Sequence, residues 1–133
     1  MHDIERQIYT PIARALRTAF PGINVSDEYV PAPSSFPHVS IVEADNYASS
    51  DHLDSGDAER YSTLLYEVNV YSAKATGKKT ECREIMAFIS QMLYAVNFTR
   101  TSNTPTPNAQ DASIYRLTAR FRAETDGENL YRI

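Results

Sequence analysis

The spacing of hydrophobic positions changes from two residues to about 3.6 between Tyr61 and Val96. The segment YSTLLYEVNVYS, residues 61–72, alternates apolar and polar side chains, which predicts a half-buried strand. The segment ECREIMAFISQMLYAV, residues 81–96, has apolar positions at helical spacing and predicts an amphipathic helix. AKATGKK joins them, so the chain should pass directly from a strand into a helix that packs on the sheet.

A second helix is predicted near the N-terminus. Pro11 should kink this helix or mark a restart with Thr10 as its cap, because proline lacks the backbone N–H of a helix interior. Pro21 and Gly22 should end the helix. Its apolar stripe recurs every four residues and consists of Ile4, Ile8, Ile12, Leu16 and Phe20.

The remaining segments predict strands, loops and a tail. The polar and acidic segment Ala48–Glu59 contains a glycine and predicts a mobile loop or the tip of a long hairpin. NTPTPNAQD, residues 103–111, should break regular structure, and DGENLYRI, residues 126–133, should form a C-terminal tail. Strands are predicted at residues 23–30, 38–47, 98–102 and 112–124.

The order of the main predicted elements is α-β-β-β-α-β, and each connection permits antiparallel pairing. The expected fold class is therefore α+β: an antiparallel sheet of about four strands, with two helices packed on one face and a long β-hairpin loop. No linker or internal repeat divides the sequence, so residues 1–133 should form a single domain.

The sheet face opposite the helices should be partly apolar and partly charged. It would carry Glu67, Asn69 and Tyr71 from the third strand. From the last strand it would carry a stripe of arginines, for which a solvated strand face, a subunit interface and a contact with nucleic acid are all open readings. The stripe consists of Arg116, Arg120 and Arg122.

Composition narrows the possible functions. With 133 residues and 42% hydrophobic positions, the chain can bury a core of its own. A formal net charge of −4 argues against a sequence-independent binder of duplex DNA, which needs clustered lysine and arginine. Cys82 is the single cysteine, which excludes an internal disulfide and fits a reducing cytoplasm. No run approaches the ~18 apolar residues of a membrane helix.

The segment GKKT, residues 77–80, suggests a phosphate-binding loop but departs from that motif at two positions. Ser72 occupies the place of the first glycine, and Lys79 occupies the place of the serine or threonine that follows the lysine. Cys82 lies on the apolar side of its predicted helix and is expected to be a small buried hydrophobe.

Metal ligands and catalytic groups are not expected either. The three histidines share no ligand spacing with each other or with Cys82. The acidic cluster Asp51, Asp54, Asp57 and Glu59 lacks the alternating spacing of a calcium loop, so a solvated loop tip is the preferred interpretation. No nucleophile motif GxSxG occurs. We therefore expect a protein that is not an enzyme and has no cofactor.

Three segments resemble a known family. SFPHVSIVEADN, YEVNVYS followed by GKKTECREIM, and RTSNTPTPNAQDASIYRLTARF are similar to tail terminator or tail completion proteins of tailed phages and prophages of Gram-positive bacteria. The resemblance covers about residues 1–125 and implies a single tail-terminator-like domain with both helices on one sheet face. The quoted motifs are typical of assembly proteins and are not catalytic signatures.

The resemblance implies a structural virion protein, located in the tail or neck and assembled in the bacterial host cytoplasm. Such a protein forms a homo-oligomeric ring, usually a hexamer, at the head-proximal end of the tail tube. It terminates tail polymerisation and provides the docking surface for the head connector. The implied partners are further copies of the chain, the tail tube protein, the head–tail connector or stopper protein and, in a contractile tail, the sheath protein. Genome DNA would pass through the lumen, and no membrane partner is implied.

A ring needs a heterologous contact that closes on itself. The helix-free sheet face and the segment Ala48–Glu59 are the parts expected to form it. A head–tail connector or another neck completion protein is an alternative function, and a small ligand-binding α+β module is a further one, which would need a pocket with convergent polar groups. The candidate interface residues are Glu67, Tyr71, Lys78, Lys79, Arg116, Arg120, Arg122, Asp51, Asp54 and Asp57.

Overall fold

The computed structural model describes residues 1–48, 61–107 and 111–133. Two helices and six strands occur in these residues, and the two long helices alternate with groups of strands as the hydrophobic periods predict. The elements are α1 (Glu5–Ala19), β1 (Asn24–Ser26), β2 (His38–Ala48), β3 (Ser62–Ser72), α2 (Lys78–Ala95), β4 (Thr99–Pro105), β5 (Tyr115–Thr125) and β6 (Leu130–Tyr131).

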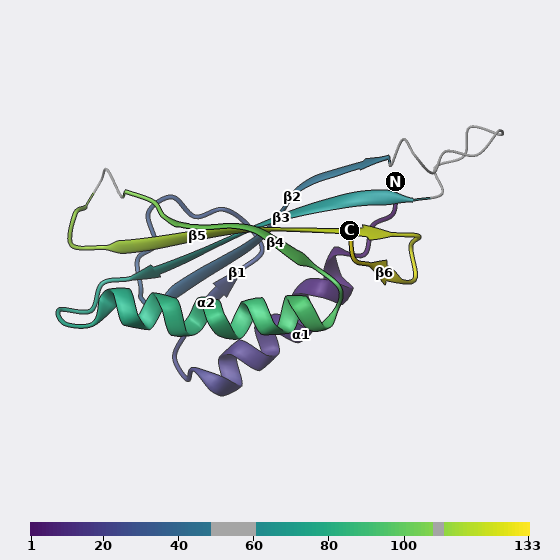
Figure 1. The fold of residues 1–133 in the computed structure, drawn as a ribbon. Coiled ribbons are helices and arrows are strands. Elements are labelled where there is room, and N and C mark those ends of the chain that lie inside the picture. Colours follow the sequence, from purple (N-terminus) through teal and green to yellow (C-terminus); the bar gives the residue numbers. More distant parts are fainter. Residues whose placement is uncertain (49–60, 108–110) are drawn as a thin grey trace.

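The strands form one sheet in the order β1-β2-β3-β5-β4, and β6 pairs with β5. Both helices lie on the same side of this sheet (Figure 1). The predicted α+β class with two helices on one face is therefore confirmed. The sheet differs in two details from the prediction of about four antiparallel strands, because the described sheet has six strands and is mixed.

The mixed pairing arises at β1, which runs parallel to β2 and pairs Val25 with Val39. A parallel neighbour requires the chain to return to the same end of the sheet, which needs a longer connection than a hairpin turn. Residues 27–37 supply this connection and contain three prolines. The predicted strand at 23–30 is correspondingly shorter, because the chain leaves the sheet after Ser26.

The core lies between the helices and the apolar face of β2, β3 and β5. Cross-strand register aligns Ile41 with Val68 and Val68 with Ala119, and all three side chains have no exposed surface. Two residues along the same face, Tyr66 of β3 lies opposite Phe121 of β5. The helices cover this face with Ile8, Ile12 and Leu16 from α1 and with Cys82, Ile85, Met86, Ile89 and Leu93 from α2.

Helix α1 is continuous through Pro11, so the predicted restart at Thr10 is wrong. The missing proline N–H would have bonded to the carbonyl of Gln7, and both residues are exposed, so water can reach that carbonyl. Phe20, predicted as the last residue of the stripe, follows the helix end. Its ring packs edge-on against Phe88 of α2 at a centroid distance of 5.5 Å and joins the two helices.

Helix α2 begins after Gly77 and ends before a left-handed residue. Gly77 has φ +84°, a conformation that glycine adopts without a steric penalty. At the other end Asn97 has φ +74°, and the N–H of Phe98 donates to the carbonyl of Leu93 at 2.9 Å. This turn moves the chain off the helix axis, so Val96, the last apolar position of the helix predicted at residues 81–96, is 41% exposed.

Cys82 is buried, as its helical position predicts. Its Sγ lies 3.5 Å from the carbonyl oxygen of Val70 and 3.7 Å from that of Tyr115. Burial, followed by the negative charge of Glu81, raises the pKa of the thiol to about 12. The thiol therefore stays protonated at neutral pH and acts as a packing group rather than as a nucleophile.

Two regions predicted as irregular form strands. β4 continues to Pro105, three residues beyond the predicted strand end at Ser102, with a register shift between Arg100 and Ser102. The predicted C-terminal tail contains β6, which is brought back onto β5 by a turn at Asp126. The carboxylate of Asp126 accepts hydrogen bonds from the N–H groups of Glu128 at 2.9 Å and Asn129 at 2.7 Å. The polar composition of the segment predicted an irregular tail and did not indicate these local hydrogen bonds.

Glu43 lies beside the core at the start of a register shift in β2. The hydroxyl of Tyr66 donates to Glu43 Oε1 at 3.4 Å, and Tyr66 has no exposed surface. Burial raises the pKa of the Glu43 carboxyl, and the nearby acidic groups of Glu5 and Asp3 raise it further, against the lowering effect of hydrogen bonds from Asn46 and Tyr66. The ionised form of Glu43 is therefore less favourable in the folded protein than in the unfolded chain.

We expect Glu43→Gln to stabilise the protein relative to wild type at neutral pH and to lose this advantage in acid. The pKa of Glu43 is higher in the folded protein than in the unfolded chain. The stability that its protonated carboxyl contributes is therefore fully present below the unfolded pKa and is lost as the pH rises through the folded pKa. Glutamine cannot ionise, so the variant avoids this loss. Urea unfolding at about pH 3 and about pH 7 measures the difference. Glu84→Gln, at an exposed position of α2, is the control. A difference between Glu43→Gln and wild type that did not change with pH would contradict this account.

Candidate interface on the helix-free face

The face of β2, β3 and β5 that points away from α1 and α2, here called the helix-free face, carries mainly polar side chains. The alternation along each strand separates these side chains from the apolar core on the other side. Three polar pairs lie opposite each other across β3 and β5: Tyr71 with Arg116, Asn69 with Thr118, and Glu67 with Arg120.

Asn69 is the centre of a hydrogen-bond network on this face. Its side-chain oxygen accepts from Arg116 Nε at 2.9 Å and from Thr118 Oγ1 at 2.7 Å. Its amide nitrogen donates to Glu67 Oε1 at 3.2 Å. Asn69 is 1% exposed, so these bonds satisfy a polar group that water does not reach. Thr118 in turn shares a 2.7 Å hydrogen bond with Thr106.

Arg116 links this network to residues 27–37, which connect β1 and β2. Its guanidinium carbon lies 5.5 Å from the ring centroid of Tyr71 and 5.5 Å from that of Tyr29. Tyr29 belongs to residues 27–37, so the connection crosses the helix-free face rather than the helix side. Burial raises the pKa of Tyr71 to about 12, and the positive charge of Arg116 opposes part of this rise.

Arg120 pairs with Glu67 within the same chain. Arg120 Nε lies 3.4 Å from Glu67 Oε2, with side chains 65% and 26% exposed. Such an exposed pair contributes about 0–1 kcal/mol. A contact between subunits through Glu67, which the sequence suggests as a partner for these arginines, would therefore have to compete with a pairing that already exists.

The other predicted interface residues are spread over the molecule. Tyr71 is 1% exposed and packs under the guanidinium of Arg116, so it offers little surface to a partner. Arg122 is exposed at the far end of the arginine stripe, opposite Leu65. Lys78, which is half-buried, and Lys79, which is exposed, begin α2. Asp51, Asp54 and Asp57 lie outside the described residues.

Sequence reasoning placed Asn69 on this face but did not recognise it as the centre of a network. The sequence did contain a sign of this role, because asparagine is depleted from strand interiors and Asn69 lies between two valines. Such a residue usually has buried partners. Nothing in the local sequence indicated Tyr29, because its contact with Arg116 depends on where residues 27–37 cross the sheet.

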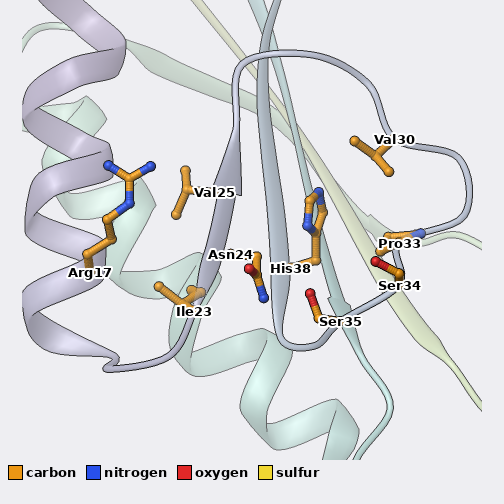
Figure 2. A pocket seen from close by; sticks show the side chains of 9 residues that line it. All are labelled: Arg17, Ile23, Asn24, Val25, Val30, Pro33, Ser34, Ser35 and His38. Atoms are coloured by element: carbon orange, nitrogen blue, oxygen red, sulfur yellow. The ribbon is translucent and has the colours of Figure 1, made fainter.

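A pocket of about 360 Å³ lies at the β1 edge of the sheet. Figure 2 shows Arg17 extending from α1 on one side of β1 and His38 of β2 on the other. His38 is 8% exposed, and its Nε2 has no hydrogen-bond partner among the described residues. Burial lowers the pKa of His38 and so favours the neutral ring. The pocket also contains Ile23, Asn24, Val25, Val30, Pro33, Ser34 and Ser35.

Two further features bear on function. Within residues 1–48, 61–107 and 111–133, no three acidic, histidine or cysteine side chains gather in a way that could hold a metal ion. In the same residues, no helix is both long and apolar enough to span a bilayer.

No protein-family model and no curated protein matches this sequence. Among solved structures, one chain in the virion of a native gene transfer agent particle has a similar fold, with a TM-score of 0.64. The two sequences are 18% identical, and the match covers 90% of this chain and 92% of that chain. At this identity the likeness shows a shared fold over most of both chains.

Proposed function

We propose that this chain is a structural protein of a phage-like virion. The observation that carries the proposal is the likeness to a virion chain over nearly the full length of both proteins. The sequence resemblance to tail terminator proteins supports the same conclusion from different data. The proposal assigns no catalytic step, metal or cofactor to the chain.

More specifically, the chain forms a ring at the head-proximal end of the tail tube, where it stops tube growth and docks the head connector. Rings require one surface of a subunit to bind a different surface of the next. Among the described residues the sheet has two different edges, β1 and β4, and a helix-free face, so one copy offers different surfaces for such a contact. Arg120 and Arg122 are the exposed charges of this face that a neighbouring protein could contact.

Deletion of the gene is expected to give overlong tails without heads, because nothing would end tube polymerisation. Electron microscopy of the particles measures tail length and head attachment together. Normal-length tails beside full heads would assign the chain instead to head–tail joining, as a connector or neck completion protein. Intact particles would contradict a structural role altogether.

A ligand-binding module is a second candidate function, favoured by the pocket beside β1. The pocket is lined by serine side chains and by the buried His38, whose Nε2 has no hydrogen-bond partner in the described part of the chain, and these are polar groups that such a module would need. The same deletion separates the two functions, because loss of a ligand-binding module would leave particle architecture unchanged.

A further inference from the structure

A second pocket, of about 340 Å³, lies between α2 and β4 on the helix side of the sheet. Its base contains Phe98 and Phe121, each 1% exposed, and one wall is the ring of Tyr94, which is 64% exposed. We call this feature the α2–β4 groove, and its full set of lining residues is Ser90, Gln91, Tyr94, Phe98, Arg100 and Phe121.

The rim of the α2–β4 groove is positively charged. Arg100 is exposed and forms no ion pair within the described parts of the chain. Arg132 stacks on the Tyr94 ring, with its guanidinium carbon 3.8 Å from the ring centroid, and donates to the carbonyl oxygen of Tyr94 at 2.6 Å. An apolar base beside two positively charged guanidinium groups, of which Arg100 has no ion pair within the described residues, fits an aromatic side chain that is flanked by carboxylates.

The chain carries such a group on its other surface. Tyr29 is 50% exposed, and its ring is held in place by Arg116. Asp27 and Glu28 precede it, and both are exposed without an ion pair in the described residues. A turn orders this segment, because Ser26 Oγ accepts from the N–H of Glu28 and donates to its carbonyl oxygen, each at 3.0 Å.

Tyr29 and the α2–β4 groove lie on opposite sides of the sheet. Tyr29 contacts Arg116 on the helix-free face, whereas the groove lies beside α2 at the β4 edge. One copy therefore cannot fill its own groove with its own tyrosine. A contact between these two different surfaces is heterologous, which is the type that a closed ring requires.

We propose that Tyr29 of one copy inserts into the α2–β4 groove of the next copy, with Asp27 and Glu28 facing Arg100. This contact rests on the ring in the proposed function and names the surfaces that form it. Tyr29 is already ordered before binding, which lowers the entropy cost of the contact. An aromatic anchor in an apolar pocket with charged residues at the rim is typical of the residues that dominate protein interfaces.

Sedimentation equilibrium of the purified full-length chain tests the contact. Tyr29→Ala should weaken self-association by about 30-fold or more, as expected for a central aromatic anchor. Tyr47→Ala is the matched control, because Tyr47 is 46% exposed and also follows an acidic residue, Asp45. Thermal unfolding of each variant verifies that it is folded.

A charge exchange tests the pairing without touching the aromatic anchor. Glu28→Lys and Arg100→Glu should each weaken self-association, and the two together in one chain should restore most of it. Arg83→Glu, at another exposed position of α2, should have little effect. With Arg100→Lys, a zero-length carboxyl–amine cross-linker should join the new amine to Asp27 or Glu28 of a differently isotope-labelled copy.

The proposal would be overturned by a wild-type chain that remains monomeric at every concentration, by a double charge variant that does not recover, or by weakening with Tyr47→Ala but not with Tyr29→Ala. The last result would assign the contact between copies to Tyr47 instead of Tyr29. Self-association that is unaffected by Tyr29→Ala would reject this contact and leave the ring intact. The electron microscopy of the deletion tests the ring function itself.

Discussion

Replacing Asn69 by alanine should lower the free energy of unfolding by about 2–4 kcal/mol, although Asn69 lies outside the hydrophobic core. The reason is that the side chain of Asn69 forms hydrogen bonds with three other side chains. Its removal takes one hydrogen-bond partner from each of Arg116 Nε, Thr118 Oγ1 and Glu67 Oε1 at the position of a side chain that is 1% exposed. Urea or guanidinium unfolding of the purified protein measures the loss.

Two further substitutions separate hydrogen bonding from packing at this position. Asn69→Leu keeps most of the side-chain volume and should cost nearly as much as Asn69→Ala, because it also removes every hydrogen bond. Asn103→Ala, at an exposed position of β4, should change stability by no more than about 0.5 kcal/mol. A nearly neutral Asn69→Leu would show that the network contributes little and that packing dominates there.

Phe98→Ala should lower the free energy of unfolding by about 3–5 kcal/mol, the range for removing a large aromatic side chain from a core. Phe98 is 1% exposed and lies where α2 ends and β4 begins. Its ring packs edge-on against Tyr66 at a centroid distance of 5.3 Å, which adds a specific contact to the apolar burial. Without this ring, a cavity would form at the base of the groove, next to the start of β4.

Calorimetry or chemical denaturation measures this effect, and the size of the substituted side chain provides the control. Phe98→Leu should cost less, because it fills most of the cavity. Tyr47→Ala removes an aromatic ring from a strand position that is 46% exposed and should change stability little. Equal losses for Phe98→Ala and Phe98→Leu would indicate that the edge-on ring contact, rather than volume, determines stability here.

The long elements could be predicted from the chain because their hydrophobic period reports directly on one buried face. In β3, Leu64, Tyr66, Val68 and Val70 recur at every second position, and all four have no exposed surface. In α2, Ile85 and Ile89 lie on the buried side as their spacing indicates. Val96 follows the same spacing but is exposed, because the period cannot show that the chain turns away at Asn97.

The candidate interface could be predicted only in part. Alternation along β3 and β5 correctly assigned Glu67, Arg116 and Arg120 to the side away from the helices. It could not show that Arg120 pairs within the chain or that Tyr71 is buried, because both depend on neighbouring strands and on residues 27–37. The exposure of Arg122 and Lys79 leaves them available to a partner.

The amino-acid sequence by itself determined which segments are helices and long strands and which side of each is apolar, since these properties depend on residues close together in the chain. Only the tertiary structure decided that β1 runs parallel to β2 and that Asn69 connects Arg116, Thr118 and Glu67. It also decided that Tyr29 and the α2–β4 groove lie on opposite sides of the sheet. These outcomes depend on contacts between residues far apart in the sequence, which no local period encodes.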